Sequence, residues 1–252
     1  MKFGRSLRRR SVREAERAFI VEGMRAVEDA VQTGAVPRYV FLRDGDSAAA
    51  SVIRRHQIVA GVHVVDSKLF DGLSDTLSPQ GVLAVFGMPA LNVEQPAAPL
   101  VLVLDRLRDP GNMGTLLRTA AAAGVTLVTL TSETVDPYNP KVVRAAMGAH
   151  FRVPIQAWND NLQRIVLQAC PVRLVADASA PTVYDTVDWL GGTALIIGSE
   201  AHGVSFEITA LATDRVSIPR SAMVESLNAA VAGGVLLFEA ARQRRRHVST
   251  FD

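Results

Sequence analysis

Short apolar runs alternate with polar segments through the first third of the chain. Apolar residues recur at helical spacing over residues 14–32 and predict a helix there. Five further segments alternate between strand and helix patterns: 39–42 (strand), 47–55 (helix), 62–65 (strand), 67–73 (helix) and 82–86 (strand). The first part of the chain is therefore predicted to form a small α/β unit.

A segment with little periodicity, residues 88–99, separates this unit from the rest of the chain. Its sequence, MPALNVEQPAAP, contains three prolines and no strong apolar run, which is typical of a linker. A continuous apolar strand follows at 100–104, then a glycine-containing turn, a helix from about 114 to 123 and a strand at 125–130. We therefore expect domains at 1–90 and 100–252, joined by a linker at 91–99.

The remaining pattern predicts more strands and helices in alternation. The segments are 162–168 (helix), 172–175 (strand), 194–197 (strand), 206–211 (helix), 216–218 (strand) and a long helix from 226 to about 245. Strands that are apolar throughout are typical of a parallel sheet covered on both faces. The second domain is therefore predicted to be α/β with a parallel sheet.

Basic residues are concentrated at the two ends of the chain. The net charge is only +2, but residues 1–17 carry seven basic and two acidic side chains. Residues 242–252 carry four basic side chains and one acidic side chain. All but three of the 27 basic residues are arginine, the side chain best suited to bidentate phosphate contacts. This distribution favours a nucleic-acid partner, although terminal charge runs can also be merely solvated. The residues predicted to contact such a partner are Arg5, Arg8, Arg9, Arg10, Arg13 and Arg108.

Several classes of protein do not fit the sequence. The single cysteine, Cys170, forms no CxxC or Cys/His cluster, so we expect neither redox nor metal chemistry and favour a reducing cytoplasm. No run of about 18 apolar residues predicts a membrane span. The basic start passes directly into an amphipathic pattern and does not resemble a secretion signal. The five histidines lack paired spacing and no Gly-x-Ser-x-Gly elbow is present, which argues against a hydrolase triad.

The first candidate motif lies where the strand at 100–104 leads into a helix. Gly111, Asn112 and Gly114 allow a backbone to approach a ligand, and the free N–H groups of a helix start favour an anion. The Gly-x-x-Gly spacing differs from the dinucleotide fingerprint, and a simple tight turn is the alternative. Arg118 shares a helix face with Gly114, so we expect it to project toward the loop.

Two further motifs follow buried strands. Glu200 lies in the glycine-rich segment IIGSEAHG, where it either borders a ligand crevice or caps the next helix. The segment VSIPRSAMVESLN ends at the start of the last helix, where Ser226 is an acceptable N-cap. Asn228 is a polar amide in an apolar helix start, and this predicts a buried hydrogen-bond partner.

Taken in order, LDRLRDPGNMGTLLRTAAAAG, IIGSEAHGV and VSIPRSAMVESLNAAVAGGVLLFEAARQR resemble the three motifs of the SPOUT superfamily, in its TrmH (SpoU) branch of RNA 2′-O-ribose methyltransferases. DPYNPKVVRAAMGAHFRVPI is also similar, and the resemblance covers residues 100–245. EAERAFIVEGMRAVEDA resembles the start of a substrate-binding domain found in members that act on large-subunit ribosomal RNA. Minimal transfer-RNA members lack that domain, so the resemblance favours 23S ribosomal RNA over transfer RNA.

The resemblance implies a trefoil-knotted α/β domain, an N-terminal fold similar to kink-turn-binding ribosomal proteins, and a homodimer that completes each S-adenosylmethionine site at its interface. No metal is expected. By motif, the implied catalytic and RNA-positioning residues are Asn112, Arg118, Glu200, Ser226 and Asn228. The implied cofactor-contacting residues are Gly198, Ser199, Ile218 and Leu227, and Leu130 and Thr131 are expected to line the same pocket.

Three other functions remain as alternatives at this stage. A transfer-RNA 2′-O-methyltransferase would share the same chemistry, and a nonenzymatic RNA-binding or ribosome-assembly factor would share the basic ends. A dinucleotide oxidoreductase would fit the βαβ unit and Glu133, which lies about 20 residues beyond the glycine loop, but the glycine spacing argues against it. The sequence does not identify the methylated nucleotide, nor whether methylation serves ribosome maturation or antibiotic resistance.

Overall fold

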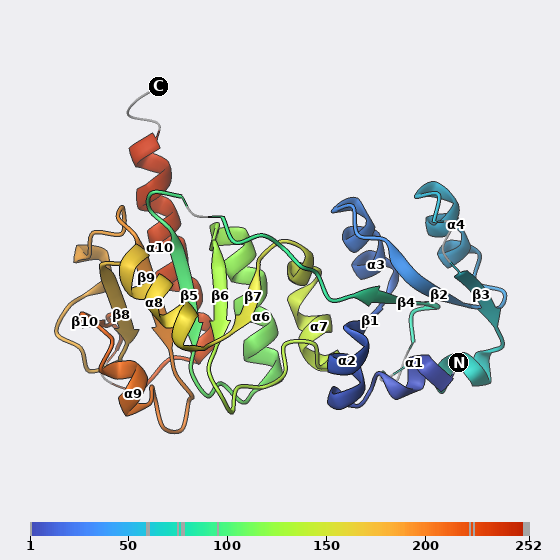
Figure 1. Cartoon of the computed structure of the whole chain (residues 1–252), viewed down its shortest axis with the longest axis horizontal. Coiled ribbons are helices and arrows are strands. Elements are labelled where there is room, and N and C mark those ends of the chain that lie inside the picture. Colours follow the sequence, from blue (N-terminus) through green and yellow to red (C-terminus); the bar gives the residue numbers. More distant parts are fainter. Residues whose placement is uncertain are drawn as a thin grey trace. The chain divides into compact units, whose positions relative to one another are not determined.

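The chain folds into two compact units in a computed structural model that describes residues 2–58, 61–74, 76, 79–94, 96–221, 223 and 225–248 (Figure 1). The first unit contains Met1–Ala90 and Asp136–Arg152, and the second contains Leu91–Val135 and Val153–Asp252. The sequence-based division at 1–90, 91–99 and 100–252 did not foresee that residues 136–152 pack with the first unit.

The first unit is built on a four-stranded mixed sheet in the order β1-β4-β2-β3. β4 pairs antiparallel with both β1 and β2, and β3 pairs parallel with β2 at the edge. Its elements are α1 (Lys2–Ser6), α2 (Arg10–Glu16), β1 (Ala18–Glu22), α3 (Met24–Gln32), β2 (Pro37–Arg43), α4 (Ser47–Arg55), β3 (Gly61–Val65), α5 (Ser67–Asp71), β4 (Val82–Gly87), α7 (Pro140–Ala146) and the short 3-10 helix η1 (Ala149–Phe151).

The helix predicted over residues 14–32 is wrong, because the strand β1 interrupts it. Arg17 adopts a left-handed conformation, with φ of 48°, and ends α2, while Gly23, with φ of 100°, separates β1 from α3. Phe19 and Ala18 point to opposite faces of the sheet and belong to different cores. Because both faces of β1 are apolar, its residues satisfied a helical period as well as a strand pattern.

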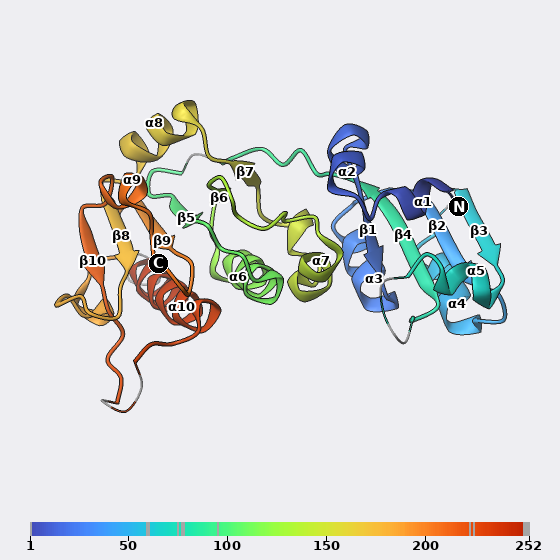
Figure 2. The ribbon, with the colours of Figure 1, turned by 90° about the horizontal axis from the view of Figure 1, so that it is seen from below.

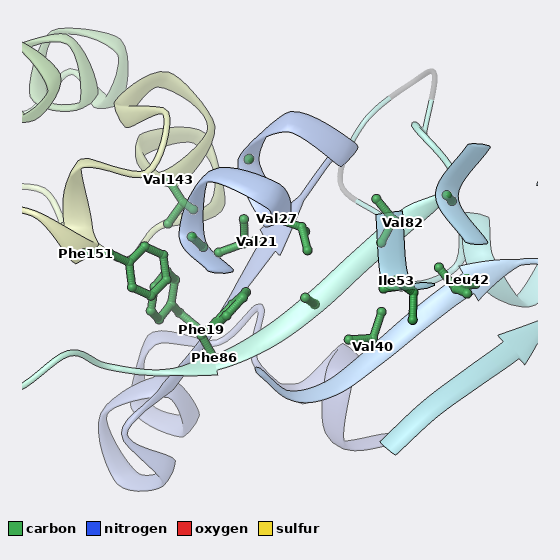
Figure 3. Close-up of a cluster of buried hydrophobic side chains, with 14 residues drawn as sticks. Phe19, Val21, Val27, Val40, Leu42, Ile53, Val82, Phe86, Val143 and Phe151 are labelled. Carbon is green, nitrogen blue, oxygen red and sulfur yellow. The ribbon is translucent and has the colours of Figure 1, made fainter. Parts of the chain in front are cut away.

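Residues from outside the first ninety complete the larger core of the first unit. Phe19 and Phe86 pack against Phe151, with ring centroids 5.6 and 5.1 Å away, and Val143 of α7 joins the same cluster (Figure 3). The opposite face of the sheet forms a second cluster around Phe70, to which α1 and α5 contribute. The segment 136–152 is therefore part of the folded first unit and not a surface loop.

The second unit is built on a six-stranded sheet in the order β10-β8-β9-β5-β6-β7, in which every pair is parallel. The helices α6 and α10 lie side by side on one face, and α8 and α9 lie on the other (Figures 1 and 2). Its elements are β5 (Leu100–Leu104), α6 (Pro110–Ala123), β6 (Leu127–Leu130), β7 (Ile155–Ala157), α8 (Asp160–Ala169), β8 (Val172–Ala176), η2 (Tyr184–Thr186), β9 (Thr193–Ile197), α9 (Phe206–Thr209), β10 (Asp214–Val216) and α10 (Ala229–Val248).

The parallel sheet and the separate N-terminal unit confirm the predicted fold class. All residues of β5 and β9 are buried, as continuous apolar strands require when both faces are covered. The predicted start of α6 at 114 is wrong, because Pro110 occupies its first turn and the Asp109 carboxylate caps it by accepting from the Asn112 N–H at 2.7 Å. The trefoil knot concerns how the chain threads, and it stays a prediction.

Candidate active site

The carboxyl ends of β8, β9 and β10 and the start of α10 surround a cavity of about 370 Å³. This volume is within the usual range for a small-molecule site. Four of the predicted cofactor residues line the cavity: Gly198, Ser199, Ile218 and Leu227. The three strands lie next to or near one another in a parallel sheet, so their carboxyl ends open at the same edge.

The tight turn after β9 forms one wall. The Ser199 N–H donates to the Gly203 carbonyl at 3.0 Å, and the Gly203 N–H donates back to the Ser199 carbonyl at 2.8 Å. A Cβ at Gly198 would lie 2.3 Å from the Gly203 carbonyl carbon, so only glycine fits there. The turn displays Glu200 at the rim of the cavity, where its side chain is exposed.

Arg220 connects two of the loops around the cavity. Its Nη1 donates to the Ala178 carbonyl at 2.6 Å, and its Nε donates to the Glu225 carbonyl at 3.0 Å. The guanidinium thus links the loop after β8 to the segment that precedes α10. Both loops contribute residues to the lining, so this link holds two walls of the cavity together.

Sequence analysis missed the loop after β8. Ala176, Asp177 and Ala178 all line the cavity, and the available signal was their place at the carboxyl end of a strand adjacent to β9. Hydrogen bonds from the Ser179 N–H and hydroxyl, together with Arg215 at 2.9 Å, hold the pKa of Asp177 below its usual range. A carboxylate therefore faces the cavity at neutral pH.

Side chains from all three motifs meet beside the cavity. Asn112 Nδ2 donates to Glu200 Oε1, and Asn228 Nδ2 donates to Asn112 Oδ1 at 2.9 Å. The carboxylate can only accept, so it fixes which end of the Asn112 amide faces Asn228. The result is a fixed chain of polar groups at the surface, with Glu200 and Asn228 exposed and Asn112 half-buried.

Asn228, and not Ser226, is the N-cap of α10. The Asn228 carbonyl oxygen Oδ1 accepts from the Ala230 N–H at 2.9 Å and from the Val231 N–H at 3.2 Å. The helix accordingly begins at Ala229, three residues after the predicted start. Asn228 does have a side-chain hydrogen-bond partner, Asn112, but this partner is half-buried at the surface and not buried as predicted, because capping places the amide there. Ser226 is exposed and lines the cavity.

Arg118 lies apart from this cluster in the single chain. It is exposed on α6, it does not line the cavity, and its guanidinium has no hydrogen-bond or ion-pair partner among the described residues. Most surface arginines in the second unit have such partners; Arg108, for example, contacts Glu133 at 2.8 Å. An arginine without a partner among the described residues is available for a group outside them.

Leu130 and Thr131 do not line the cavity, contrary to the prediction. They lie at the end of β6, which β5 separates from β9. The Thr131 hydroxyl instead donates to Asp105 Oδ1 at 2.6 Å. Asp105 is buried, and its other oxygen accepts from the Ser205 N–H at 2.6 Å. This carboxylate joins the ends of β5 and β6 to the start of α9, and so supports the loops that carry Asn112 and Glu200.

The predicted RNA-binding arginines of the first unit are not equivalent. Arg5, Arg8 and Arg9 are exposed on α1 and the turn that follows it, and Arg10 is exposed beside Glu14 at 2.7 Å. Arg13 is buried, so its assignment to the RNA surface is wrong.

Arg13 instead has a structural role inside the first unit. Its Nε donates to Asp136 Oδ2 at 3.1 Å, Nη2 donates to the same oxygen, and Nη1 donates to the carbonyls of Leu7 and Arg8 at 2.7 Å each. With the side chain only 4% exposed, no phosphate can approach it in this conformation. The guanidinium holds the N-terminal segment to residue 136.

The described residues contain neither a metal-binding group nor a membrane-spanning helix. No group of three or more His, Cys, Asp or Glu side chains there could hold a metal ion. No helix in the same residues is long and apolar enough to cross a membrane.

Cys170 is a free, buried thiol, and burial raises its pKa to about 11.

The sheet, the cavity and the cluster of motif residues together define an RNA methyltransferase. Residues 99–238 match the model of the SpoU rRNA methylase family, and residues 1–84 match that of the MRM3-like substrate binding domain. The chain belongs to the SpoU rRNA methylase family.

Relatives of known name resemble the chain over most of its length. It is 34% identical to mouse mitochondrial rRNA methyltransferase 3, over 94% of this chain and 70% of the relative. It is 30% identical to the Bacillus subtilis 23S rRNA (guanosine(2553)-2′-O)-methyltransferase RlmP, over 93% of this chain and 92% of that protein. The SpoU methyltransferase AviRb of Streptomyces viridochromogenes, solved with AdoMet, superposes with a TM-score of 0.87 at 28% identity over 97% of both chains.

Proposed function

We propose that this protein transfers the methyl group of S-adenosylmethionine to a ribose 2′-hydroxyl of large-subunit ribosomal RNA. The observation that carries the proposal is the meeting of Asn112, Glu200 and Asn228 beside a cavity of cofactor size. The names of the relatives, which include rRNA methyltransferases and a 23S rRNA 2′-O-methyltransferase, support the reaction and the substrate class.

The residues around the cavity fit the proposed cofactor. Ile218 and Leu227 offer apolar surface for an adenine ring, and the turn at Gly198 and Ser199 brings backbone groups close to the cavity without intervening side chains. The cofactor supplies a methyl group already activated by its sulfonium. The protein has to bind it, exclude water and place the ribose oxygen in line with the methyl carbon.

Positioning is the main contribution expected of the motif residues. A ribose 2′-hydroxyl is a poor nucleophile near neutral pH, and correct placement of two reactants can lower a barrier by several kcal/mol, at most roughly 7 to 11. The chain of Asn228, Asn112 and Glu200 offers donors and acceptors in fixed directions at the cavity rim. These groups orient the nucleotide relative to the cofactor.

Arg118 is given the role of stabilising the negative charge that develops on the ribose 2′-oxygen. A guanidinium stays protonated in proteins, so it is a poor general base. As a clamp, its planar fork would contact the adjacent phosphate and the 2′-oxygen together, stabilising alkoxide character while the proton leaves to phosphate or water. The absence of a partner for Arg118 among the described residues supports this role.

The proposal includes a homodimer in which Arg118 of one subunit completes the cavity of the other. α10 exposes Val231 by 54% and Phe238 by 46%, and these side chains lie on the helix that packs against α6, the helix of Arg118. Large exposed apolar side chains at a helix pair are typical of a subunit interface. Covering them with a second copy would bring a second Arg118 near the site.

The cytoplasmic location also stays a prediction.

Mixing two inactive variants tests this arrangement. In a mixed dimer, one subunit carries Arg118→Ala and the other carries Glu200→Ala. If Arg118 acts across the interface, one of the two sites contains both an intact Arg118 and an intact Glu200. If Arg118 acts within its own chain, neither site contains both. After subunit exchange, random pairing gives half mixed dimers with one good site each, so we expect roughly a quarter of wild-type activity. No recovery, despite demonstrated mixed dimers, would place Arg118 in its own subunit's site.

Methyl transfer itself is tested with labelled S-adenosylmethionine. The acceptors are unmethylated 23S ribosomal RNA and bulk transfer RNA, and the product is mapped by resistance to alkaline cleavage, with Arg118→Ala as control. We expect label at one ribosomal nucleotide and none with the variant. Label on transfer RNA alone would overturn the substrate. Cofactor binding without transfer to free RNA, ribosomal subunits or assembly intermediates would favour the nonenzymatic RNA-binding alternative.

A further inference from the structure

Three rings from three elements of the first unit form a continuous group at the open edge of its sheet. Phe3 of α1 lies edge-on to Tyr39 of β2, with ring centroids 5.9 Å apart, and Tyr39 lies 6.3 Å from His63 of β3. The register pairs Phe41 with His63 and Tyr39 with Gly61, so Tyr39 and His63 share one face of the sheet. We call Phe3, Tyr39 and His63 the aromatic edge.

The aromatic edge is accessible although rings of this size are usually buried. Tyr39 is 41% exposed and His63 is exposed, whereas Phe41, the ring beneath His63, is only 4% exposed. Phe41 and His63 are stacked, with centroids 5.5 Å apart and planes at 24°. The buried ring therefore supports the exposed one from below and fixes its plane.

Gly61 keeps the face of these rings uncovered. It lies on the edge strand beside Tyr39 and His63, and a Cβ there would be 3.3 Å from Tyr39 Cδ1 and 3.5 Å from His63 Nε2. Its φ is not in the left-handed region, so the backbone does not require glycine. A side chain at this position would occupy the space in front of the two rings.

Positive charge lies next to the aromatic edge in the chain. Residues 2–10, which include the helix α1 that contributes Phe3, carry five basic side chains and no acidic one. Lys2, Arg5, Arg8 and Arg9 are exposed. In Figure 2, α1 lies close to the strands β2 and β3 in this unit. Exposed rings flanked by cations form a surface suited to a flexible polyanion with flat, apolar groups.

We propose that the aromatic edge binds unpaired bases of the RNA substrate by stacking, while the basic residues of α1 contact the neighbouring phosphates. Single-stranded RNA is the partner with this combination of π-faces and closely spaced negative charge, and stacking on aromatic side chains is the usual means of holding unpaired bases. The inference rests on the proposed function, because that function makes RNA the substrate.

Equilibrium binding without cofactor tests the surface separately from catalysis. The probe is a fluorescently labelled, unmethylated fragment of 23S ribosomal RNA, chosen because the wild-type protein binds it, and binding is measured by anisotropy. Loss of one stacking side chain should weaken binding roughly tenfold, so we expect that change for both Tyr39→Ala and His63→Ala. Tyr39→Trp, which keeps a large ring, should bind as tightly as the wild type.

Two further variants separate ring stacking from effects on the fold. Gly61→Val keeps all three rings in the sequence but places a side chain against Tyr39 and His63, and should weaken RNA binding to a similar extent. Val64→Ala is the matched control, because Val64 is 63% exposed on the same strand but pairs with Leu42 and so faces the opposite side of the sheet. It should leave RNA binding unchanged, and the thermal transitions of all variants should show that they are folded.

The outcomes distinguish this inference from the proposed function. Wild-type RNA affinity in folded Tyr39→Ala and Gly61→Val would overturn the aromatic edge, even if the wild-type protein methylates RNA. Weakened binding in both, with normal binding by Val64→Ala, would support it even in a protein that fails to transfer methyl groups. If Tyr39→Ala, Gly61→Val and Val64→Ala all lost RNA affinity equally, the loss would not depend on the exposed rings, and the stacking proposal would be wrong.

Discussion

Buried polar side chains of the first unit contrast with the exposed polar side chains at the candidate site of the second unit. In the first unit, Arg13 and Asp136 are nearly buried and bond to each other, and His150 is 2% exposed. In the second unit, Glu200 and Asn228 are exposed, although hydrogen bonds fix their positions. Buried polar groups join distant parts of the chain, whereas exposed and oriented ones are available to a ligand. Burial thus distinguishes polar residues that hold the fold together from polar residues that a ligand can reach.

Removing the carboxylate of Asp136 should have the largest effect on stability. Asp136→Ala leaves the buried Arg13 guanidinium without its counter-charge, and breaking a buried pair in this way costs about 3 to 5 kcal/mol. Chemical denaturation should show this loss. The replacement of both partners by apolar residues, Arg13→Met with Asp136→Leu, should recover most of it.

An exposed pair in the same unit provides the control for Asp136. Arg10 and Glu14 are 2.7 Å apart but 62% and 58% exposed, so Glu14→Ala should cost less than about 1 kcal/mol. Equal losses for Asp136→Ala and Glu14→Ala would mean that burial does not distinguish the two pairs. The assignment of Arg13 to the fold, and not to RNA, would then lose its basis.

Arg118 should show the opposite behaviour, with a large effect on rate and little on stability. Loss of a group that stabilises developing charge lowers kcat about 100- to 1000-fold, and Arg118 is exposed and has no partner among the described residues whose loss would unfold the protein. Arg118→Ala should therefore keep the wild-type unfolding transition. Arg118→Lys keeps the charge but not the planar fork, and near-wild-type turnover by that variant with normal RNA affinity would contradict the clamp.

His150 should make the stability of the first unit depend on pH. Burial lowers its pKa to about 4, against about 6.5 in an unfolded chain, while its Nε2 contacts the Pro137 carbonyl at 2.7 Å. Below pH 6.5 the unfolded chain binds the additional proton, so the unfolding free energy should fall by about 3 kcal/mol as the pH decreases from 6.5 to 4.

Denaturation at several pH values, with His150→Phe beside the wild type, checks this dependence. The unfolding free energy of the variant should fall less between pH 6.5 and 4, because phenylalanine at position 150 cannot be protonated. His202→Gln is the matched control, since His202 is exposed, and it should keep the wild-type pH dependence. An unchanged dependence in His150→Phe would show that other groups cause the loss.

Asp105 should give the smallest of these effects, because the fold around it can still form. Asp105→Asn keeps the volume but places an amide NH₂ against the Ser205 N–H or the Thr131 hydroxyl, which costs about 1 to 2 kcal/mol. The loops bearing Asn112 and Glu200 would shift, so kcat should fall more than RNA affinity. Thr131→Val removes one of the two donors and should reproduce only part of the decrease.

Much of the fold could be predicted because the core strands of the second unit are mostly apolar, and β5 is apolar throughout. β5 at Leu100–Leu104 was predicted at its observed bounds. Residues 14–32 were misread because β1 has apolar residues on both faces, and the conformations of Arg17 and Gly23 that break the pattern leave no periodic signal. The packing of residues 136–152 with the first unit depends on contacts such as Arg13 with Asp136, which are 123 residues apart.

The motifs placed the site residues near one another but could not give their arrangement. Asn112 and Glu200 were expected at neighbouring strand ends, but which amide group meets the carboxylate depends on loops separated by 88 residues. Asn228 was expected to have a buried hydrogen-bond partner, because its capping role cannot be recognised without knowing where α10 begins. Arg13 was assigned to RNA because a buried arginine and an exposed one look alike in a run of basic residues.

We propose that the first unit binds the RNA and the second unit transfers the methyl group. Single-turnover methylation of the 23S fragment tests this division most directly. It is measured at increasing enzyme concentration with saturating S-adenosylmethionine. The account predicts that Tyr39→Ala raises the enzyme concentration required for half-maximal rate and leaves the maximal rate near wild type. It predicts that Arg118→Ala lowers the maximal rate at saturating enzyme. A fall in maximal rate for Tyr39→Ala, or full recovery of Arg118→Ala at high enzyme concentration, would contradict it.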